Sequence, residues 1–506
     1  MKHFLFLIFP MFVLGQSNPV NEVRKYRMSN EHELLNVYFD FLRIPNIAAD
    51  LPNIRKNAFW IADHMKSKGI SNVQLLSSKT NDTPPAVYGE VIVPGATKTI
   101  IFYAHYDGQP VDSTKWANGL HPFKPQLANG SLASGASLIK WPSKATPFDP
   151  EWRIYGRGSS DDKAGVFTII NAYAALAKLK ISPSVNIKFF FEGEEEAGST
   201  HLHEIFNQNR DLLKSDIWVI CDGPVHQSGQ KQVVFGVRGD THLELTVFGS
   251  SRPLHSGHYG NWAPNPAMAL AQLLASMKNA QGEVTIRGFY EDVIPLSSAE
   301  KKALSRLPPV EQALQKELGF SKAERPGTLN ENLNLPSLNI NGLQSAGVGK
   351  LSANVIPTKA IASIDLRLVA GNDWKKQQQK VIDHIKSMGY HVTEKEPSAE
   401  ERAAHDKLCM VVRSDGYNAQ KTPMDNAMAQ SIVKAVSAAL PQSPLMLPTL
   451  GGSLPLFIFE EMLNTKPVTV PIANHDNNQH AENENIRIKN LWDGLEMFAS
   501  IMIMTK

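Results

Sequence analysis

The stretch FFFEGEEEAGS, residues 189–199, holds the sharpest contrast in the sequence, because an apolar run passes directly into acidic residues. The phenylalanines are typical of a buried strand, and the acidic residues after them indicate a turn. The four glutamates are Glu192, Glu194, Glu195 and Glu196. Like charges at this spacing repel one another, so the turn must either face water or lie beside a cation.

Three other segments in the first half of the chain also contain or directly precede ionisable residues. They are TIIFYAH (99–105), which ends in His105 and precedes Asp107, GRGSSDDKAG (156–165), which contains Asp161 and Asp162, and DIWVIC (216–221), which precedes Asp222. Singly, each has a simpler explanation, such as capping of a helix by an aspartate. Together they predict one sheet edge where carboxylates and an imidazole bind a cation, because the carboxyl ends of parallel strands converge.

Apolar runs alternate with helix-like stretches in this half of the chain, which favours an α/β fold with a mainly parallel sheet. The runs are 86–93, 99–105, 185–191 and 216–221, and the clearest helix is 164–179. Polar and apolar residues then alternate in 241–248 and 360–369, as in strands with one exposed face. We therefore expect an inserted α+β domain, 239–418, within a discontinuous larger domain, 18–238 and 419–506.

The composition restricts the class of protein. A chain of 506 residues exceeds the size of a single core, so two packed units are expected. Hydrophobic residues make up 42% and charged residues 20%, which is typical of a soluble globular enzyme. A formal net charge of +2 gives no broad attraction for nucleic acid. With only Cys221 and Cys409 present, a disulfide framework is excluded and at most one bridge can form. A cysteine-ligated metal site is not expected, because two thiols would need ligands from other residues.

The N-terminal sequence is typical of a secretory signal peptide. Residues 1–17, MKHFLFLIFPMFVLGQS, place a lysine before an apolar stretch that is too short to span a bilayer. No later segment is long and apolar enough to span a membrane. We expect the mature protein to be exported to the periplasm or the extracellular space. A retained N-terminal anchor is the alternative.

The motifs YAHYDGQP, GRGSSDDKAG, FEGEEEAGS, RPLHSGHYG, GGSLP and HAENE follow one another along nearly the whole chain. In this order the chain resembles the dinuclear zinc metallopeptidases of the carnosinase, aminoacylase and carboxypeptidase G type, and most closely the carnosinase-like dipeptidase branch. The resemblance implies that the larger domain is catalytic and that the inserted domain is a lid that also dimerises.

The resemblance also implies a role for each strand-end residue. Asp161 would bridge two metal ions, of which one is completed by His105 and Asp222 and the other by Glu196 and His480. Asp107 would orient a ligand imidazole, and Glu195 would be the general base. A cis peptide between Asp161 and Asp162 is implied as well. Zinc is the expected metal, and manganese or cobalt would suit the same ligands.

Two histidines compete for the late ligand position. His475 lies five residues before His480 in NHDNNQHAENENI. The family pattern is a histidine followed shortly by Asn-Glu, which fits His480 with Asn483 and Glu484. We therefore expect His480 to be the ligand and His475 to lie outside the metal site.

The remaining substrate-binding residues expected from the resemblance lie in or near the inserted domain. His255, in RPLHSGHYG, would reach a partner subunit's active site, so the enzyme would be a homodimer. Arg367, in DLRLVAG, would bind a substrate carboxylate, although Ala370 stands where the family often has proline. Asn354 and Ser453 match substrate-contacting positions less closely.

The predicted function is hydrolysis of dipeptides or short peptides by a metal-dependent exopeptidase. An N-acyl-amino-acid deacylase of the same fold, acting on a substrate such as acetylornithine or succinyl-diaminopimelate, is the alternative, because both use the same water and base. A catalytically dead metal or peptide binder would not need Glu195 together with all five ligands.

Overall fold

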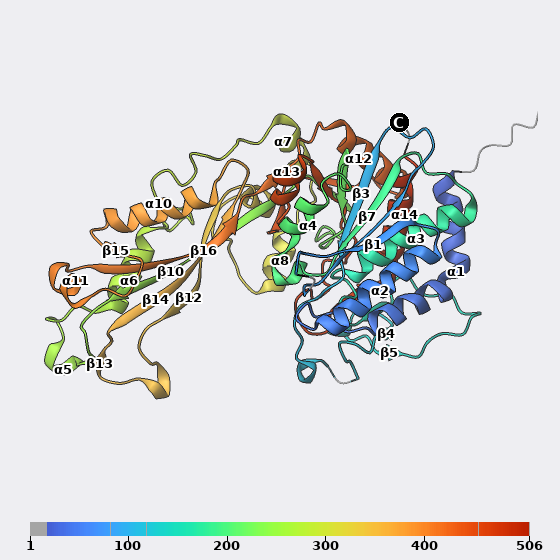
Figure 1. The fold of residues 1–506 in the computed structure, drawn as a ribbon. Coiled ribbons are helices and arrows are strands. Elements are labelled where there is room, and N and C mark those ends of the chain that lie inside the picture. The colour runs from blue at the N-terminus through green and yellow to red at the C-terminus, as the bar shows by residue number, and fades with distance from the viewer. Residues whose placement is uncertain (1–17, 81, 118, 454, 505–506) are drawn as a thin grey trace, which may run out of the picture.

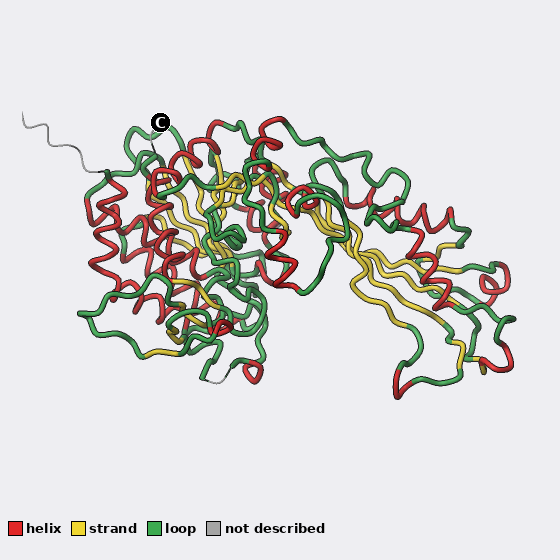
Figure 2. The backbone as a smooth tube through the Cα atoms, turned by 180° about the vertical axis from the view of Figure 1, so that it is seen from behind, coloured by secondary structure: helices red, strands yellow, loops and turns green. Residues whose placement is uncertain are grey.

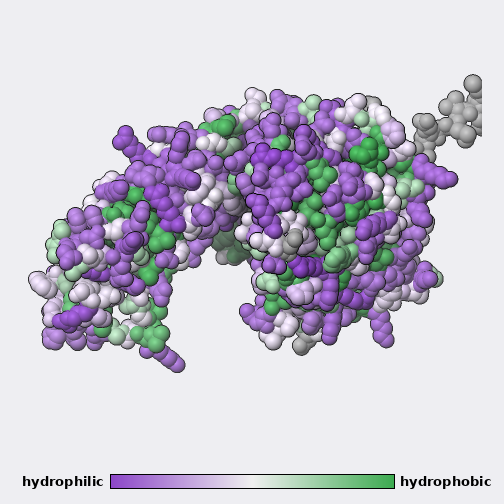
Figure 3. Space-filling model, viewed as in Figure 1, coloured by the Kyte–Doolittle hydropathy of each residue, from purple (hydrophilic) through white to green (hydrophobic). Residues whose placement is uncertain are grey.

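The computed structural model describes residues 18–80, 82–117, 119–453 and 455–504, so the predicted signal peptide, 1–17, lies outside the described residues. Two bodies lie side by side (Figure 1). One contains the chain's N-terminal and C-terminal helices packed on a large sheet, and the other is an elongated sheet with helices on one face. Figure 3 shows a hollow between the two bodies.

The large sheet has eight strands, and its centre is parallel. In spatial order the strands are β1 (Ser71–Leu76), β2 (Ala86–Val91), β7 (Asn186–Glu192), β3 (Thr99–His105), β8 (Ile217–Ile220), β20 (Pro467–Thr469), β9 (Gln232–Val234) and β18 (Leu445–Leu447). The β7, β3, β8 and β20 strands are parallel neighbours, whereas β1 and β2 are added antiparallel. The predicted α/β class with a mainly parallel sheet is therefore confirmed.

Helices cover both faces of this sheet, which explains why its strands are apolar without alternation. On one face lie α1 (Pro19–Leu42), α2 (Leu51–Ser67), α3 (Lys163–Leu179), α12 (Ala427–Ala439) and α14 (Ile488–Met502), and on the other α4 (Leu202–Gln208) and α13 (Phe457–Leu463). Phe189 and Phe191 belong to the first core and Phe190 to the second. The three phenylalanines of the acidic stretch thus hold β7 between two layers of helices.

A small four-stranded sheet brings the end of the chain to the metal-binding segment. Its strands, in order, are β21 (Asn485–Arg487), β6 (Arg153–Tyr155), β4 (Gln126–Ala128) and β5 (Leu138–Ile139). Asn485 pairs with Tyr155 across β21 and β6. This pairing places the loop before β21 beside the loop that carries Asp161.

The second body is built on a mainly antiparallel sheet. Its main path is β12 (Ser337–Gln344), β14 (Lys359–Leu368), β10 (Gly236–Phe248), β16 (Leu408–Tyr417) and β15 (His391–Thr393). The helices α6 (Pro266–Ser276) and α10 (Trp374–Ser387) contribute to the core on one face, with Leu243, Leu245 and Val247 of β10. The alternation seen in 241–248 is thus the alternation of a buried and an open face.

The strand β10 connects the two bodies. Gly236 and Val237 pair with β17 (Gln420–Lys421), and Val237 and Arg238 pair with β19 (Leu450–Ser453). From Gly239 onward β10 pairs with β14. Figure 2 shows the strands of the second sheet running toward the larger body. The predicted boundaries, 18–238, 239–418 and 419–506, stay a prediction.

Shorter elements complete the described chain. They are β11 (Leu254–His255), α5 (Ser256–Tyr259), α7 (Ser298–Leu304), α8 (Glu311–Leu318), α9 (Leu329–Leu333), β13 (Val355–Ile356), α11 (Ala399–Ala404) and short 3-10 turns at Ser113–Lys115, Leu132–Ser134, Glu195–Ala197 and Gly349–Leu351. Cys221 and Cys409 are both buried free thiols. Among the described helices, none combines the length and apolarity required to cross a bilayer.

Candidate metal centre

Asp161 lies between two histidines that are far apart in sequence. Its Oδ1 atom is 3.0 Å from Nε2 of His105, at the end of β3, and its Oδ2 atom is 3.2 Å from Nε2 of His480. Asp161 is buried and comes from the loop between β6 and α3, not from a strand of the large sheet. The peptide between Asp161 and Asp162 is cis, which confirms that expectation.

Two groups of possible metal ligands share this carboxylate. One consists of His105, Asp161 and Asp222, and the other of Asp161, Glu196 and His480. Within each group the ligand atoms lie within 4.8 Å of one another. The structure therefore brings together all five residues predicted as ligands, in the predicted pairs. Mixed imidazole and carboxylate oxygen donors are a set that zinc, manganese and cobalt all accept.

The electrostatics of these groups fit divalent cations. Burial raises the pKa of Asp222 to about 6. Burial, reinforced by the charge of Asp161, raises the pKa of Glu196 to about 8. Asp161 Oδ2 is buried without a hydrogen bond of good geometry. Neighbouring buried carboxylates stay charged only beside positive charge, which bound divalent cations would provide.

Asp107 positions residues on both sides of the site. Its carboxylate oxygens accept hydrogen bonds from the backbone N–H groups of Glu195, at 3.1 Å, and Glu196, at 2.9 Å. Its carbonyl oxygen lies 3.2 Å from Nδ1 of His105, and its Oδ1 atom lies 3.4 Å from the same nitrogen. One buried aspartate thus orients the imidazole and anchors the glutamate turn.

Glu195 lies beside the ligand groups without belonging to either. Its Oε2 atom is 3.9 Å from Nε2 of His105, and its side chain is 13% exposed. Burial raises the pKa of Glu195 well above its usual value, and the nearby charges of Asp222 and Glu196 add to this effect. A carboxylate with a raised pKa next to a metal centre is suited to accept a proton.

Glu484 is a buried anchor whose role the sequence did not reveal. Its carboxylate accepts hydrogen bonds from the backbone N–H groups of Gly158, Ser160 and Asp161, at 3.1, 2.9 and 3.0 Å. It also forms a 2.7 Å ion pair with Arg157. In the sequence Glu484 only completes the pattern after His480, within a polar run that gives no sign of burial.

Two further contacts support the acidic turn and were also missed. Gln109, four residues after His105, donates a 2.7 Å hydrogen bond from Nε2 to Oε2 of Glu196. The hydroxyl of Tyr103 donates a 2.7 Å hydrogen bond to Glu192, whose pKa burial raises to about 7. Glu192, for which the sequence suggested no role, thus lies behind the site.

A cavity of about 940 Å³ lies over the ligand groups and reaches the second body. Its walls include Asp161, Glu195 and His480 on one side and Asp240, Arg367 and Tyr417 on the other. Arg367, predicted to bind substrate, is therefore in the same cavity as the metal ligands. Ser453 is the last residue of β19, and its side chain lies outside the described part of the chain.

His255 and Asn354 are not among the described residues that line this cavity. They adjoin each other, because the N–H of Ser256 donates a 3.0 Å hydrogen bond to the carbonyl of Asn354. Both are exposed, near α5 and β13, at the far end of the second body (Figure 1). Within one chain the structure does not bring these two predicted residues to the site.

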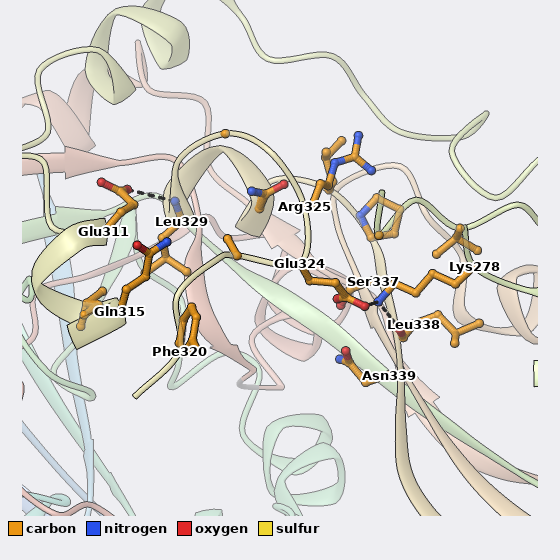
Figure 4. A pocket seen from close by; sticks show the side chains of 18 of the residues that line it. Lys278, Glu311, Gln315, Phe320, Glu324, Arg325, Leu329, Ser337, Leu338 and Asn339 are labelled. Carbon is orange, nitrogen blue, oxygen red and sulfur yellow. Dashed lines mark hydrogen bonds and ion pairs between the residues drawn. The ribbon is translucent and has the colours of Figure 1, made fainter. Parts of the chain in front are cut away.

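A second cavity, of about 350 Å³, lies where the segment around α8 and α9 meets β12 (Figure 4). Two contacts join polar groups of its wall: Lys278 Nζ is 2.7 Å from Glu324 Oε1, and Glu311 accepts a 3.0 Å hydrogen bond from the N–H of Leu329. None of the residues described as lining it belongs to either ligand group around Asp161. It is therefore separate from the candidate metal centre.

The chain is similar to known peptidases in sequence and in structure. The chain is 26% identical over 439 residues to human Beta-Ala-His dipeptidase, covering 85% of this chain and 79% of that protein. It is 25% identical over 491 residues to the Cys-Gly metallodipeptidase DUG1 of Saccharomyces cerevisiae, covering 91% and 93%. The structure of the M20 family metallo-carboxypeptidase Sso-CP2 from Sulfolobus solfataricus matches with a TM-score of 0.75 at 26% identity, covering 93% and 99%.

A family model provides the clearest assignment. Residues 101–504 match the model described as peptidase family M20/M25/M40. The matched range contains the five ligand candidates and Glu195. The chain therefore belongs to peptidase family M20/M25/M40.

Proposed function

We propose that this protein is a dinuclear metal-dependent dipeptidase, or an exopeptidase that acts on short peptides. The observation that carries the proposal is the position of Asp161, which is shared by two ligand groups while Glu195 lies beside them without joining either. The relatives named above as a Beta-Ala-His dipeptidase and a Cys-Gly metallodipeptidase support the substrate class.

The chemistry divides between the metal ions and the protein's own groups. Two divalent cations, held by the two ligand groups, would lower the pKa of a water molecule and polarise the scissile carbonyl. As general base, Glu195 would take a proton from the attacking water and return it to the amine that is released when the peptide C–N bond breaks. Asp107 holds the Glu195–Glu196 turn and the imidazole of His105 in place for this transfer. Zinc is the metal that we propose.

Substrate binding would use the second body as a lid. Arg367, across the cavity from the ligand groups, would bind the carboxylate at the end of the peptide, because a guanidinium matches a carboxylate in geometry and charge. Ser453 and Asn354 are proposed as further substrate contacts. Recognition of a free carboxylate in the same cavity as the ligand groups would favour short peptides.

His255 and Asn354 would act from a second copy of the chain. Both lie on the exposed end of the lid, and large apolar side chains are exposed in the same domain. These include Trp262, Leu343, Val348 and Leu351. Hydrophobic residues gather on the side of the lid that borders the hollow (Figure 3). A homodimer would cover this surface and complete each active site.

Export of the mature enzyme is a further part of the proposal. It is supported by residues 1–17, whose lysine and short apolar stretch are typical of a signal peptide. N-terminal sequencing of the protein released by a secreting host would identify the cleavage site. Recovery of the full-length chain in the membrane fraction would favour a retained anchor instead.

A substrate panel tests the proposed function. Metal-free protein is returned to zinc, manganese or cobalt in turn, and each form is assayed with dipeptides, tripeptides and N-acyl amino acids. A dipeptidase should turn over dipeptides with the highest kcat/KM and require a divalent ion. Faster turnover of N-acetylornithine or N-succinyl-diaminopimelate would show a deacylase of the same fold, and no hydrolysis of any substrate would exclude both activities.

A further inference from the structure

Arg367 belongs to a cluster of charged and polar residues on the open face of the lid sheet. The register places Asp240 opposite Arg367 and His242 opposite Asp365 across β10 and β14. On the other side of β14, Asn339 of β12 lies opposite Asp365. Residues two apart on a strand share a face, so these side chains point to the same side of the sheet.

Asp365 is the centre of this cluster. Its Oδ2 atom accepts hydrogen bonds from Nε of Arg367, at 3.4 Å, and from Nδ2 of Asn339, at 3.3 Å. Its Oδ1 atom lies 3.1 Å from Nε of Arg367 and 3.3 Å from Nε2 of His242. Asp365 is only 3% exposed. Side chains from three strands therefore surround one buried carboxylate. Figure 4 shows where Asn339 lies on β12.

The donor atoms of Asp240, His242 and Asp365 lie close enough together to hold a metal ion. A guanidinium already occupies this position, because Nε of Arg367 is 3.1 Å from Asp365 and 3.6 Å from Asp240. A divalent ion there would meet the repulsion of a permanent positive charge. The arrangement therefore suits anchoring of the arginine better than binding of a cation.

We propose that Asp365 is a positioning residue that fixes the guanidinium of Arg367 for recognition of the substrate's terminal carboxylate. The inference rests on the proposed function, in which Arg367 binds that carboxylate. Arginine has a long side chain, and holding it in one orientation before binding avoids an entropy cost at the moment of binding. An anchor at Nε engages one of five N–H donors and is compatible with binding of a carboxylate by the terminal nitrogens.

Two effects of Asp365 oppose each other, and two substitutions separate them. Its negative charge competes with the substrate for Arg367, whereas its oxygens hold the guanidinium in place. Asp365→Asn removes the charge and keeps an acceptor oxygen of similar position. Asp365→Ala removes both. If anchoring dominates, the alanine variant loses substrate binding and the asparagine variant retains most of it.

The experiment uses full-length enzyme loaded with metal and compares Ala-Ala with its C-terminal amide. Asp365→Ala should raise KM for Ala-Ala about tenfold or more, a loss near 1.4 kcal/mol, with kcat within about threefold and KM for the amide unchanged. Asp365→Asn should raise KM for Ala-Ala less than about threefold. The matched control is Asp292→Ala. Asp292 forms an ion pair with Lys380 in the same domain and is not among the residues described as lining the cavity. This variant should behave as wild type.

Each outcome decides the inference. An Asp365→Ala enzyme with unchanged KM for Ala-Ala, or with equal changes for Ala-Ala and the amide, would overturn it. If Asp365→Ala does not fold, Asn339→Ala, at an exposed position, replaces it and should raise KM for Ala-Ala alone by about threefold; no change would overturn the inference. Failure of the wild type to hydrolyse Ala-Ala or any other dipeptide would overturn the proposed function itself.

Discussion

The buried carboxylate of Glu484 accepts a 3.0 Å hydrogen bond from the backbone N–H of Asp161. The same carboxylate holds Gly158 and Ser160 through their backbone N–H groups. Because His480 lies four residues before Glu484, this contact joins the segments that carry two of the candidate ligands. A residue outside both ligand groups thus holds the segments of two candidate ligands together.

Replacing this anchor should weaken metal binding. Glu484→Gln removes the charge that faces Arg157 and places an amide N–H where backbone donors already point. We expect metal affinity to fall about 10- to 100-fold. The free energy of unfolding should fall by about 3 kcal/mol, because a buried arginine loses its partner. Metal titration and urea unfolding of the metal-free protein measure the two effects.

Glu482→Gln is the matched control for this prediction, since Glu482 lies in the same loop and is less buried. It should leave both the metal affinity and the free energy of unfolding close to the wild-type values. Equal effects of Glu482→Gln and Glu484→Gln would show that the loop as a whole, and not the Glu484 carboxylate, supports the site.

Asp107 should be needed for catalysis although it lies outside both ligand groups. In Asp107→Asn one of the two oxygens that hold the N–H groups of Glu195 and Glu196 becomes an amide nitrogen. The turn should then shift, and we expect kcat/KM to fall about 10- to 100-fold. Asp112→Asn, an exposed aspartate nearby, is the control. If Asp107→Asn keeps the wild-type kcat/KM, Asp107 has no positioning role.

His64 should make the stability of the protein depend on pH. Its ring stacks on Trp60 and lies 3.4 Å from the side-chain amide of Asn171. Burial lowers the pKa of His64 from 6.5 to about 4, and Lys68 adds to this effect. The unfolded chain therefore binds more protons between these values, so the free energy of unfolding falls as the pH drops from 6.5 toward 4.

The contribution of His64 should be about 1–3 kcal/mol across this range. His64→Gln should remove that part of the acid destabilisation, measured as the difference in urea unfolding between pH 7 and pH 4.5. His203→Gln, on the exposed side of α4, should keep the wild-type difference. If His64→Gln and the wild type lose the same free energy on acidification, His64 is not the group responsible.

The proposed homodimer can be tested by subunit mixing. Glu195→Gln and His255→Ala should each be inactive as homodimers if His255 acts in a partner's site. In a mixed dimer, the site with an intact Glu195 receives an intact His255 from the other chain. Random reassortment of equal amounts should restore about a quarter of the wild-type rate. No recovery in mixed dimers would show that His255 does not act across the interface.

Much of the metal centre could be predicted from local sequence. His105, Glu196 and Asp222 follow apolar runs that become β3, β7 and β8, and these strands are adjacent and parallel. Their carboxyl ends therefore meet wherever the sheet forms. The presence of Asp161 at this site could be predicted because it lies just before α3, a helix that packs on the same sheet. The roles assigned to these residues and the domain boundaries stay predictions.

The remaining contacts depend on pairings that local sequence does not encode. Glu484 lies in a polar run and is buried only because β21 pairs with β6, about 330 positions earlier in the chain. Asp365 lies in a segment where polar and apolar residues alternate, as in a strand with one exposed face. It is buried because β10 and β12 bring His242 and Asn339 against it. Such contacts follow from strand register, which is set by the whole sheet.

The most direct test of the metal centre and its base combines metal analysis with the Glu195→Gln variant. Wild-type protein and Glu195→Gln should each contain two divalent ions per chain, because Glu195 belongs to neither ligand group. The variant should lose kcat for dipeptide hydrolysis by about a thousandfold, whereas Glu194→Gln, whose carboxylate pairs with His201, should keep most of it. Wild-type turnover in Glu195→Gln, or fewer than two ions in an active wild-type enzyme, would contradict the account.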